Sequence, residues 1–95
     1  MTSKTDEIVG VWHADQEYYH LGAYFNLKYV FAPDGTVTEF WYGVEDGTLQ
    51  KQFDLIWEKD SEREYTLNDG KDFRRYTISD DKLCDVDFSL YYHRG

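Results

Sequence analysis

The sequence contains few of the residues that build covalent or metal-based scaffolds. Cys84 is the only cysteine, so the chain can form neither an internal disulfide nor a zinc site made of cysteines. The seven glycines occur singly along the chain, which leaves no glycine-rich loop for phosphate. With 95 residues, the chain predicts one domain near the lower size limit for a core without such crosslinks.

Long apolar runs and positive charge are also scarce. No stretch approaches the length of a membrane span, and the first residues, MTSKTDE, have no apolar run after their lysine. Nineteen acidic against ten basic residues give a net charge of −9, whereas binding to a phosphate backbone needs a patch of Lys and Arg. We therefore expect a cytoplasmic protein that binds neither membranes nor nucleic acid.

Helix signals are nearly absent, while aromatic residues are abundant. The single proline, Pro33, lies in a turn, and no long segment has the helical period. Aromatic residues make up 19% of the chain, with nine Tyr, six Phe and three Trp, a composition typical of strands and of bulky cross-strand pairs. These features predict an all-β fold.

The clearest element is a hairpin over residues 24–42. Large apolar residues alternate with smaller or polar ones before the turn Pro33-Asp34-Gly35, so the large residues share one face. A three-residue loop is favoured because it uses both the proline and the glycine, and it pairs Tyr29 with Glu39. A two-residue loop is the alternative, and it would turn Phe40 inward and Glu39 outward.

The favoured register places a carboxylate in an apolar face. Glu39 would lie near Tyr29 and, through the parity of the strand at 72–79, near Arg74. A lone buried carboxylate is costly, so we expect it to be paired with Arg74, bonded to tyrosine hydroxyls or partly protonated. Perturbed carboxylates inside pockets are candidates for function.

Turn signals recur every eight to twelve residues along the rest of the chain. Further strands are predicted at 8–14, 49–59, 63–68, 72–79, 82–86 and 88–94, with Phe88, Leu90 and Tyr92 on one face of the last. This pattern predicts an antiparallel up-and-down meander of seven or eight strands, with a flexible lead-in at 1–7 and a single domain at 8–95. The predicted core is Trp12, Phe25, Leu27, Tyr29, Phe31, Val37, Trp41, Phe53, Leu55, Trp57, Tyr65, Leu67, Tyr76, Ile78, Leu83, Leu90 and Tyr92.

The connection at 15–23 is the longest segment without alternation, and it could hold a short helical turn or a loose flap. Because loops often carry function, Tyr18, Tyr19 and His20 are its candidates for a portal or for contact with a partner. Buried side chains that fill gaps are the alternative.

Signals for catalysis and metal binding are weak. The three histidines lack the spacing of metal ligands. Asp80, Asp81, Asp85 and Asp87 form an acidic cluster without the pattern of a calcium loop, which favours a solvated turn. The sequence predicts no catalytic residue, no metal site and no cofactor.

A GxW motif at Gly10 and Trp12, a series of DG-type hairpins and the penultimate Arg94 resemble the lipocalins and related small β-barrels. The order of segments is closer still to short lipocalin-like (calycin-type) domains of uncharacterised bacterial and archaeal proteins. The resemblance implies a meander barrel that holds a small apolar ligand, with the first-strand Trp packed against the late Arg across the closed end.

Three functions follow from these features. The first is a non-catalytic domain that holds a small apolar or amphipathic molecule in its interior. The residues expected to line it are Tyr29, Glu39, Trp41, Phe53, Trp57, Tyr65, Arg74 and Tyr76. The alternative is an acidic protein-interaction or inhibitor module acting through edge strands and the 15–23 connection, and open edges would favour a homodimer. An enzyme would need Glu39, Arg74 and a histidine in one pocket.

Overall fold

The computed structural model describes residues 6–95, so most of the predicted lead-in, residues 1–5, lies outside the described residues. Residues 6–95 contain nine β-strands and no helix, and hence no helix able to cross a membrane. The strands are β1 Gly10–Ala14, β2 Tyr18–His20, β3 Ala23–Phe31, β4 Thr36–Gly43, β5 Leu49–Ser61, β6 Glu64–Asn68, β7 Phe73–Ser79, β8 Lys82–Asp85 and β9 Leu90–Arg94.

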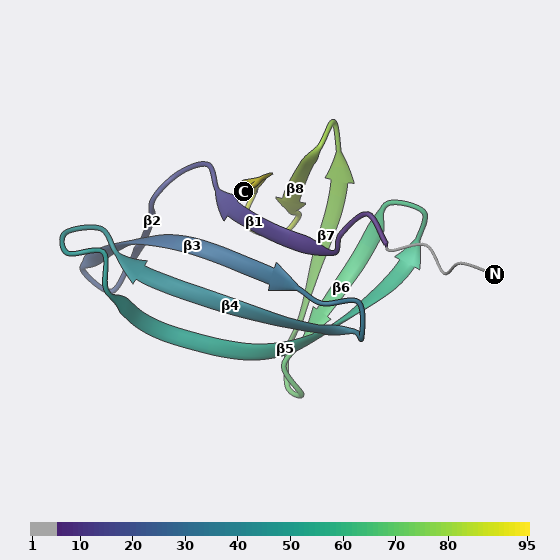
Figure 1. The fold of residues 1–95 in the computed structure, drawn as a ribbon, viewed down its shortest axis with the longest axis horizontal. Helices are drawn as coiled ribbons and strands as arrows, with labels where there is room; N and C mark the ends of the chain where they lie inside the picture. The colour runs from purple at the N-terminus through teal and green to yellow at the C-terminus, as the bar shows by residue number, and fades with distance from the viewer. Residues whose placement is uncertain (1–5) are drawn as a thin grey trace.

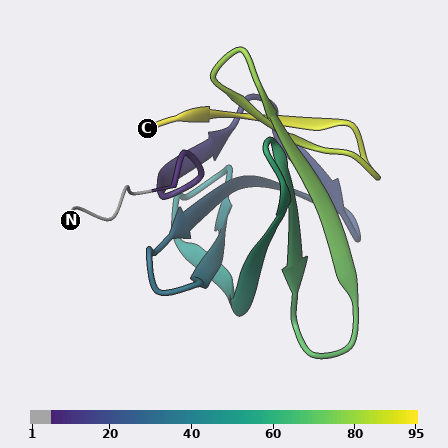
Figure 2. The ribbon, with the colours of Figure 1, turned by 90° about the vertical axis from the view of Figure 1, so that its right-hand side faces the viewer.

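Eight of these strands close into an antiparallel barrel. Neighbours from β3 to β9 pair in chain order, and β1 closes the circle by pairing with both β9 and β3. In Figure 1, β3, β4 and β5 run along the long axis, with β7 and β8 steeply inclined to them. Figure 2 shows how the last strand returns beside β1. The predicted all-β, up-and-down meander is therefore confirmed.

The β3–β4 turn adopts the favoured three-residue form. Ala32 N donates to Thr36 O at 2.9 Å, and Gly35 has φ 94°, a left-handed value that glycine accommodates without steric cost. The register pairs Phe31 with Val37 and Tyr29 with Glu39. Glu39 is therefore 1% exposed and faces the interior. The prediction of an inward carboxylate is confirmed.

The 15–23 connection forms neither a helical turn nor a loose flap. Residues 18–20 are the extra strand β2, which pairs with the start of β3 through a two-residue turn at Leu21 and Gly22. Both turn residues have positive φ, as in the tight turns that match strand twist. Because β1 pairs with the end of β3, β1 and β2 lie along successive parts of the same strand edge.

One end of the barrel is closed by stacked aromatic and cationic side chains. The Arg94 guanidinium lies over the Trp12 ring at 4.2 Å from its centroid, and Trp12 Nε1 donates to Ile8 O at 2.8 Å. This contact is the one that the resemblance to lipocalin-like barrels implies. Ile8, which the sequence pattern placed in a strand but not in the core, is fully buried there.

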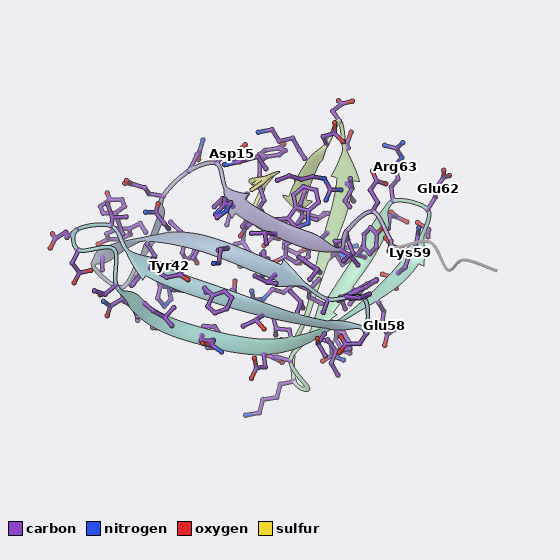
Figure 3. The ribbon with its side chains drawn as sticks, viewed as in Figure 1. Asp15, Tyr42, Glu58, Lys59, Glu62 and Arg63 are labelled. Atoms are coloured by element: carbon purple, nitrogen blue, oxygen red, sulfur yellow. The ribbon has the colours of Figure 1, made fainter. Side chains whose placement is uncertain are left out.

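The chain before β1 packs on the same end. Tyr65 donates to Asp6 Oδ1 at 2.5 Å, and Lys59 lies 3.5 Å from the same carboxylate. Figure 3 shows Lys59 beside the β5–β6 turn, near the start of the described chain. We call this region, built around Trp12, Phe31, Trp57, Tyr65 and Arg94, the closed end.

The predicted core is largely confirmed, with one clear error. Fourteen of its residues are buried, and Trp57 and Leu90 are partly buried against them. Phe53, however, is 40% exposed. β5 pairs with β4 over most of its length, but β6 spans five residues and covers only the part of β5 after Leu55. Within residues 6–95, the part of β5 around Phe53 therefore has a neighbouring strand on one edge only, which leaves the Phe53 side chain partly open to solvent.

Candidate functional site

A cavity of about 430 Å³ opens at the end of the barrel opposite the closed end. Its wall combines inward side chains of β3, β4, β7, β8 and β9 with β2 and the loops beside them. We call it the mouth cavity. The lining residues are Tyr18, His20, Leu27, Tyr29, Glu39, Trp41, Asp72, Phe73, Arg74, Asp85, Asp87, Phe88, Leu90 and Tyr92.

An ion pair and two tyrosines form its floor. Arg74 Nη1 donates to Glu39 Oε1 and Oε2 at 3.2 and 3.1 Å, and Tyr29 donates to Oε2 at 2.8 Å. Since Tyr29 gives its one proton to Glu39, Tyr76 must donate to Tyr29 across their 2.5 Å contact. Each Glu39 oxygen thus has at least one donor, as a buried carboxylate requires.

The charges in this network are mutually compensated. Burial alone would lower the pKa of Arg74, but the neighbouring Glu39 carboxylate outweighs it and raises that pKa, so the guanidinium stays charged. Burial, and then the neighbouring Tyr76, raise the pKa of Tyr29 well above its ordinary value, which keeps the hydroxyl protonated as a donor. The floor is therefore a fixed, neutral ion pair with a positioned hydroxyl chain.

Asp85 is a second buried carboxylate, and it lacks a cationic partner of this kind. It is 3% exposed, and its Oδ1 accepts the backbone N–H groups of Asp87 and Phe88 at 3.0 and 3.2 Å. Among residues 6–95, no hydrogen bond reaches its Oδ2. Burial raises the pKa of Asp85 above its ordinary value, although the two backbone bonds oppose the shift.

The rim of the cavity on the β2 side is aromatic. Tyr18 and His20 stack at 5.9 Å, and each meets the Trp41 ring nearly edge to face. Trp41 is 8% exposed, and within the described chain its Nε1 is the buried side-chain polar atom without a hydrogen-bond partner. A buried hydrogen-bond donor without an acceptor lowers stability, and the Trp41 indole N–H is such a donor in the cavity wall.

The structure brings together half of the predicted ligand-binding residues. Tyr29, Glu39, Trp41 and Arg74 line the mouth cavity, and Tyr76 supports it from behind Tyr29. The other three predicted residues lie elsewhere. Trp57 and Tyr65 belong to the closed end, and Phe53 lies beside Trp41 on the open part of β5, outside the cavity wall.

The residues predicted for partner contact divide between the two sides of β2. Tyr18 and His20 face inward and line the cavity, whereas Tyr19 is 58% exposed and packs against Tyr24 on the outer face. The alternation of a strand explains the split, because successive side chains point to opposite faces.

Sequence reasoning missed several lining residues. Asp85 was assigned to a solvated turn, but it follows Leu83 by two positions on β8 and therefore faces inward with it. The parity of Leu83 could have identified it. Phe88 does not share a face with Leu90 and Tyr92, because β9 begins only at Leu90, and Phe88 is instead an exposed side chain at the cavity rim.

The geometric condition for an enzyme is met, since Glu39, Arg74 and His20 line one cavity. However, both Glu39 oxygens are engaged by Arg74, and one also by Tyr29, which favours a positioning role over proton transfer. Among residues 6–95, no group of three or more His, Cys, Asp or Glu side chains is arranged to hold a metal ion.

A second cavity, also of about 430 Å³, lies between the β2–β3 turn and the β4–β5 loop. Of its lining residues only Phe25 is buried, and the others are exposed or half-buried. It contains no buried charged group, so the mouth cavity is the better candidate site.

No protein-family model, curated protein or solved structure matches this chain.

Proposed function

We propose that this barrel is a non-catalytic binding domain that holds a small apolar or amphipathic molecule in the mouth cavity. The observation that carries the proposal is a cavity of about 430 Å³ whose aromatic walls surround buried polar groups at its floor. Pockets for small molecules have this composition, in which apolar walls provide affinity and a few fixed polar groups orient the ligand.

The division of the interior supports this function. At the closed end, Trp12 and Trp57 both place their indole N–H on backbone carbonyls at 2.8 Å. At the mouth, Trp41 Nε1 is buried without such a partner among the described residues, and Asp85 Oδ2, which no residue of that part of the chain contacts by a hydrogen bond, is open to the cavity. Incomplete satisfaction inside a cavity is expected where a ligand supplies the missing contacts.

We also propose kinship with the short lipocalin-like barrels. Support comes from the closed eight-strand meander and from the Arg94 guanidinium over the Trp12 ring of the GxW motif. This kinship agrees with a ligand-binding role, but a fold alone does not specify function.

Two measurements test the binding function. Native mass spectrometry of freshly purified protein should detect a retained small molecule, and an environment-sensitive apolar dye should bind at one site per chain. Leu90→Trp, which adds bulk inside the cavity, should abolish dye binding. Leu49→Trp is the matched control, because Leu49 is 47% exposed on β5, outside the cavity.

Circular dichroism of both variants checks that the barrel is retained. If Leu90→Trp binds the dye as well as Leu49→Trp does, the mouth cavity is not the binding site. If the purified protein retains no small molecule and binds no dye, the binding function itself is wrong.

A protein-interaction module is the second candidate. It is favoured by β5 residues before Leu55, which have β4 on one edge and, among residues 6–95, no strand on the other, and by the exposed side chains Leu49 and Phe53 on that part of β5. Such edges pair with other chains. Analytical ultracentrifugation should then show a homodimer at micromolar concentration that Lys51→Pro, on this edge, converts to monomer. A strict monomer at high micromolar concentration would remove the homodimer.

A further inference from the structure

We infer that the ligand of the mouth cavity carries a cationic head, a protonated amine, which pairs with the Asp85 carboxylate while its apolar part lies against the aromatic wall. This inference rests on the proposed binding function and specifies the chemical class of the ligand. It follows from three observations: the negative charge of the cavity lining, the hydrogen bonds of Asp85, and the ion pair that Glu39 and Arg74 already form at the floor.

The lining carries an excess of negative charge. Glu39, Asp72, Asp85 and Asp87 contribute four carboxylates, against the single guanidinium of Arg74. The Glu39–Arg74 pair cancels within the floor, which leaves Asp72, Asp85 and Asp87, and of these Asp87 is partly compensated by an exposed ion pair with Arg75 at 3.5 Å. Clefts lined by one sign of charge attract ligands of the opposite sign, and low-dielectric walls strengthen the attraction.

Asp85 is the most deeply placed of these three groups. The side chain is 3% exposed and lines the cavity, and its position is fixed by the two backbone N–H bonds to Oδ1. Since Oδ2 has no hydrogen bond from residues 6–95, the carboxylate presents one oxygen that can accept from a ligand. An ammonium group supplies both the positive charge and the N–H donor that this oxygen lacks.

An anionic ligand is the competing possibility, because Arg74 also lines the cavity with its side chain 33% exposed. The charge of Arg74 is already compensated, however: its Nη1 donates to both oxygens of Glu39 and, at 3.3 Å, to Tyr29, so an anionic ligand could use only the remaining guanidinium nitrogens and would share the cation with Glu39. A carboxylate ligand would also lie close to the like charges of Asp72 and Asp85, which line the same cavity. The cavity therefore favours a cation over an anion.

The walls suit the rest of such a molecule. Tyr18, Trp41, Phe73 and Phe88 provide aromatic surface around the cavity. Aromatic faces attract cations and also bury apolar groups. An aryl-alkyl amine combines both requirements, with its ammonium at Asp85 and its ring against the rim.

Three probes of similar shape and different charge test this assignment: 2-phenylethylammonium, 2-phenylethanol and 3-phenylpropanoate. Their affinities are measured at pH 7 and low salt by titration of amide signals in NMR spectra of the full chain. We expect the ammonium probe to bind at least about tenfold more tightly than the alcohol, and the carboxylate probe to bind most weakly.

Asp85→Asn then identifies the counter-ion. Asn keeps an oxygen that can accept the two backbone N–H bonds, so the loop after β8 should be retained, and the amide spectrum reports this directly. The variant should lose the preference for the ammonium probe and bind the alcohol within about twofold of the unmodified protein. Asp54→Asn, an exposed site on β5 outside the cavity, is the control with the same change in net charge.

The outcomes separate the two proposals. If none of the three probes binds at millimolar concentration, the binding function fails together with the cation assignment. If all three bind with similar affinity, or Asp85→Asn and Asp54→Asn weaken the ammonium probe equally, the cation assignment is overturned while the binding function stands.

Discussion

The two ends of this barrel are built from the same alternating strands. They differ in how densely their interiors are packed and in how many of their buried polar atoms have hydrogen-bond partners. At the closed end, Trp12, Trp57 and Tyr65 fill the space and each places its polar atom on a partner in the chain. At the mouth, the strands enclose a cavity in which Trp41 keeps a buried indole N–H without a partner among the described residues, and Asp85 keeps one carboxylate oxygen open to the cavity.

The difference teaches where stability and function reside in a small barrel. Dense packing with satisfied polar groups stabilises the fold, whereas hollow and partly unsatisfied regions cost stability and are retained where a ligand contacts them. Apart from the Glu39–Arg74 pair at its floor, the mouth should therefore tolerate, or even gain stability from, changes of a kind that would destabilise the closed end.

The largest effect is expected at the closed end. Phe31→Ala should lower the free energy of unfolding by about 3 to 5 kcal/mol, because Phe31 is 2% exposed between Tyr29 and Trp57. Phe73→Ala makes the same chemical change at a side chain that is 68% exposed and should cost less than about 1 kcal/mol. Urea unfolding measures both, and equal losses would contradict the distinction between the ends.

The next effect concerns the paired carboxylate. Arg74→Met leaves Glu39 buried without its cation and should cost about 2 to 3 kcal/mol at pH 7, less than for a fully buried pair because Arg74 is partly exposed. Adding Glu39→Gln to this variant should recover most of the loss. A double variant no more stable than Arg74→Met would show that the ion pair is not the cause.

Asp85→Asn should act in the opposite direction. A carboxyl whose folded pKa is raised binds protons more readily in the folded state, so its contribution to stability falls as pH rises between the unfolded and the folded pKa. Above the folded pKa the penalty of the buried charge is present, and there the variant should be more stable by about 1 kcal/mol. Below about pH 4 the two proteins should converge in Tm. A loss of stability at pH 7 would mean that a partner in the chain compensates Asp85.

The smallest effect is expected at Asp6. Burial would raise its pKa, but the hydrogen bond from Tyr65 and further contacts outweigh burial and hold that pKa below its ordinary value. Its contribution is present above the unfolded pKa and is lost as pH falls through the folded one. Asp6→Asn should therefore cost about 0.5 to 1 kcal/mol at pH 7 and nothing in strong acid. A difference that persists in acid would assign the loss to packing.

The features predicted correctly from sequence are those that strand alternation and turn chemistry determine locally. The Pro33-Asp34-Gly35 loop decided the register, and the register placed Glu39 opposite Tyr29 in the interior. The inward direction of Arg74 was predicted from its parity with Tyr76 on β7. In the structure, β4 and β7 place the Arg74 guanidinium 3.1 Å from the Glu39 carboxylate.

The features that were missed depend on the length over which each strand is paired with its neighbours. Phe53 has the correct parity, but β6 is too short to cover it. Asp85 resembles the exposed acids around it in sequence, and only its pairing between β7 and β9 places it inside the barrel. Strand length and pairing are tertiary properties that a local pattern does not contain.

One spectrum tests the contrast between the two ends most directly, because the three tryptophans report on them separately. Trp12 and Trp57 lie at the closed end with bonded indole N–H groups, and Trp41 lines the mouth cavity without a bond. In a ¹⁵N–¹H NMR titration with 2-phenylethylammonium, the indole signal of Trp41 should move with the amides of residues 85–90, while those of Trp12 and Trp57 stay in place. Equal movement of all three indole signals, or movement at Trp12 and Trp57 alone, would contradict the claim that the ligand binds in the mouth cavity while the closed end is filled by side chains.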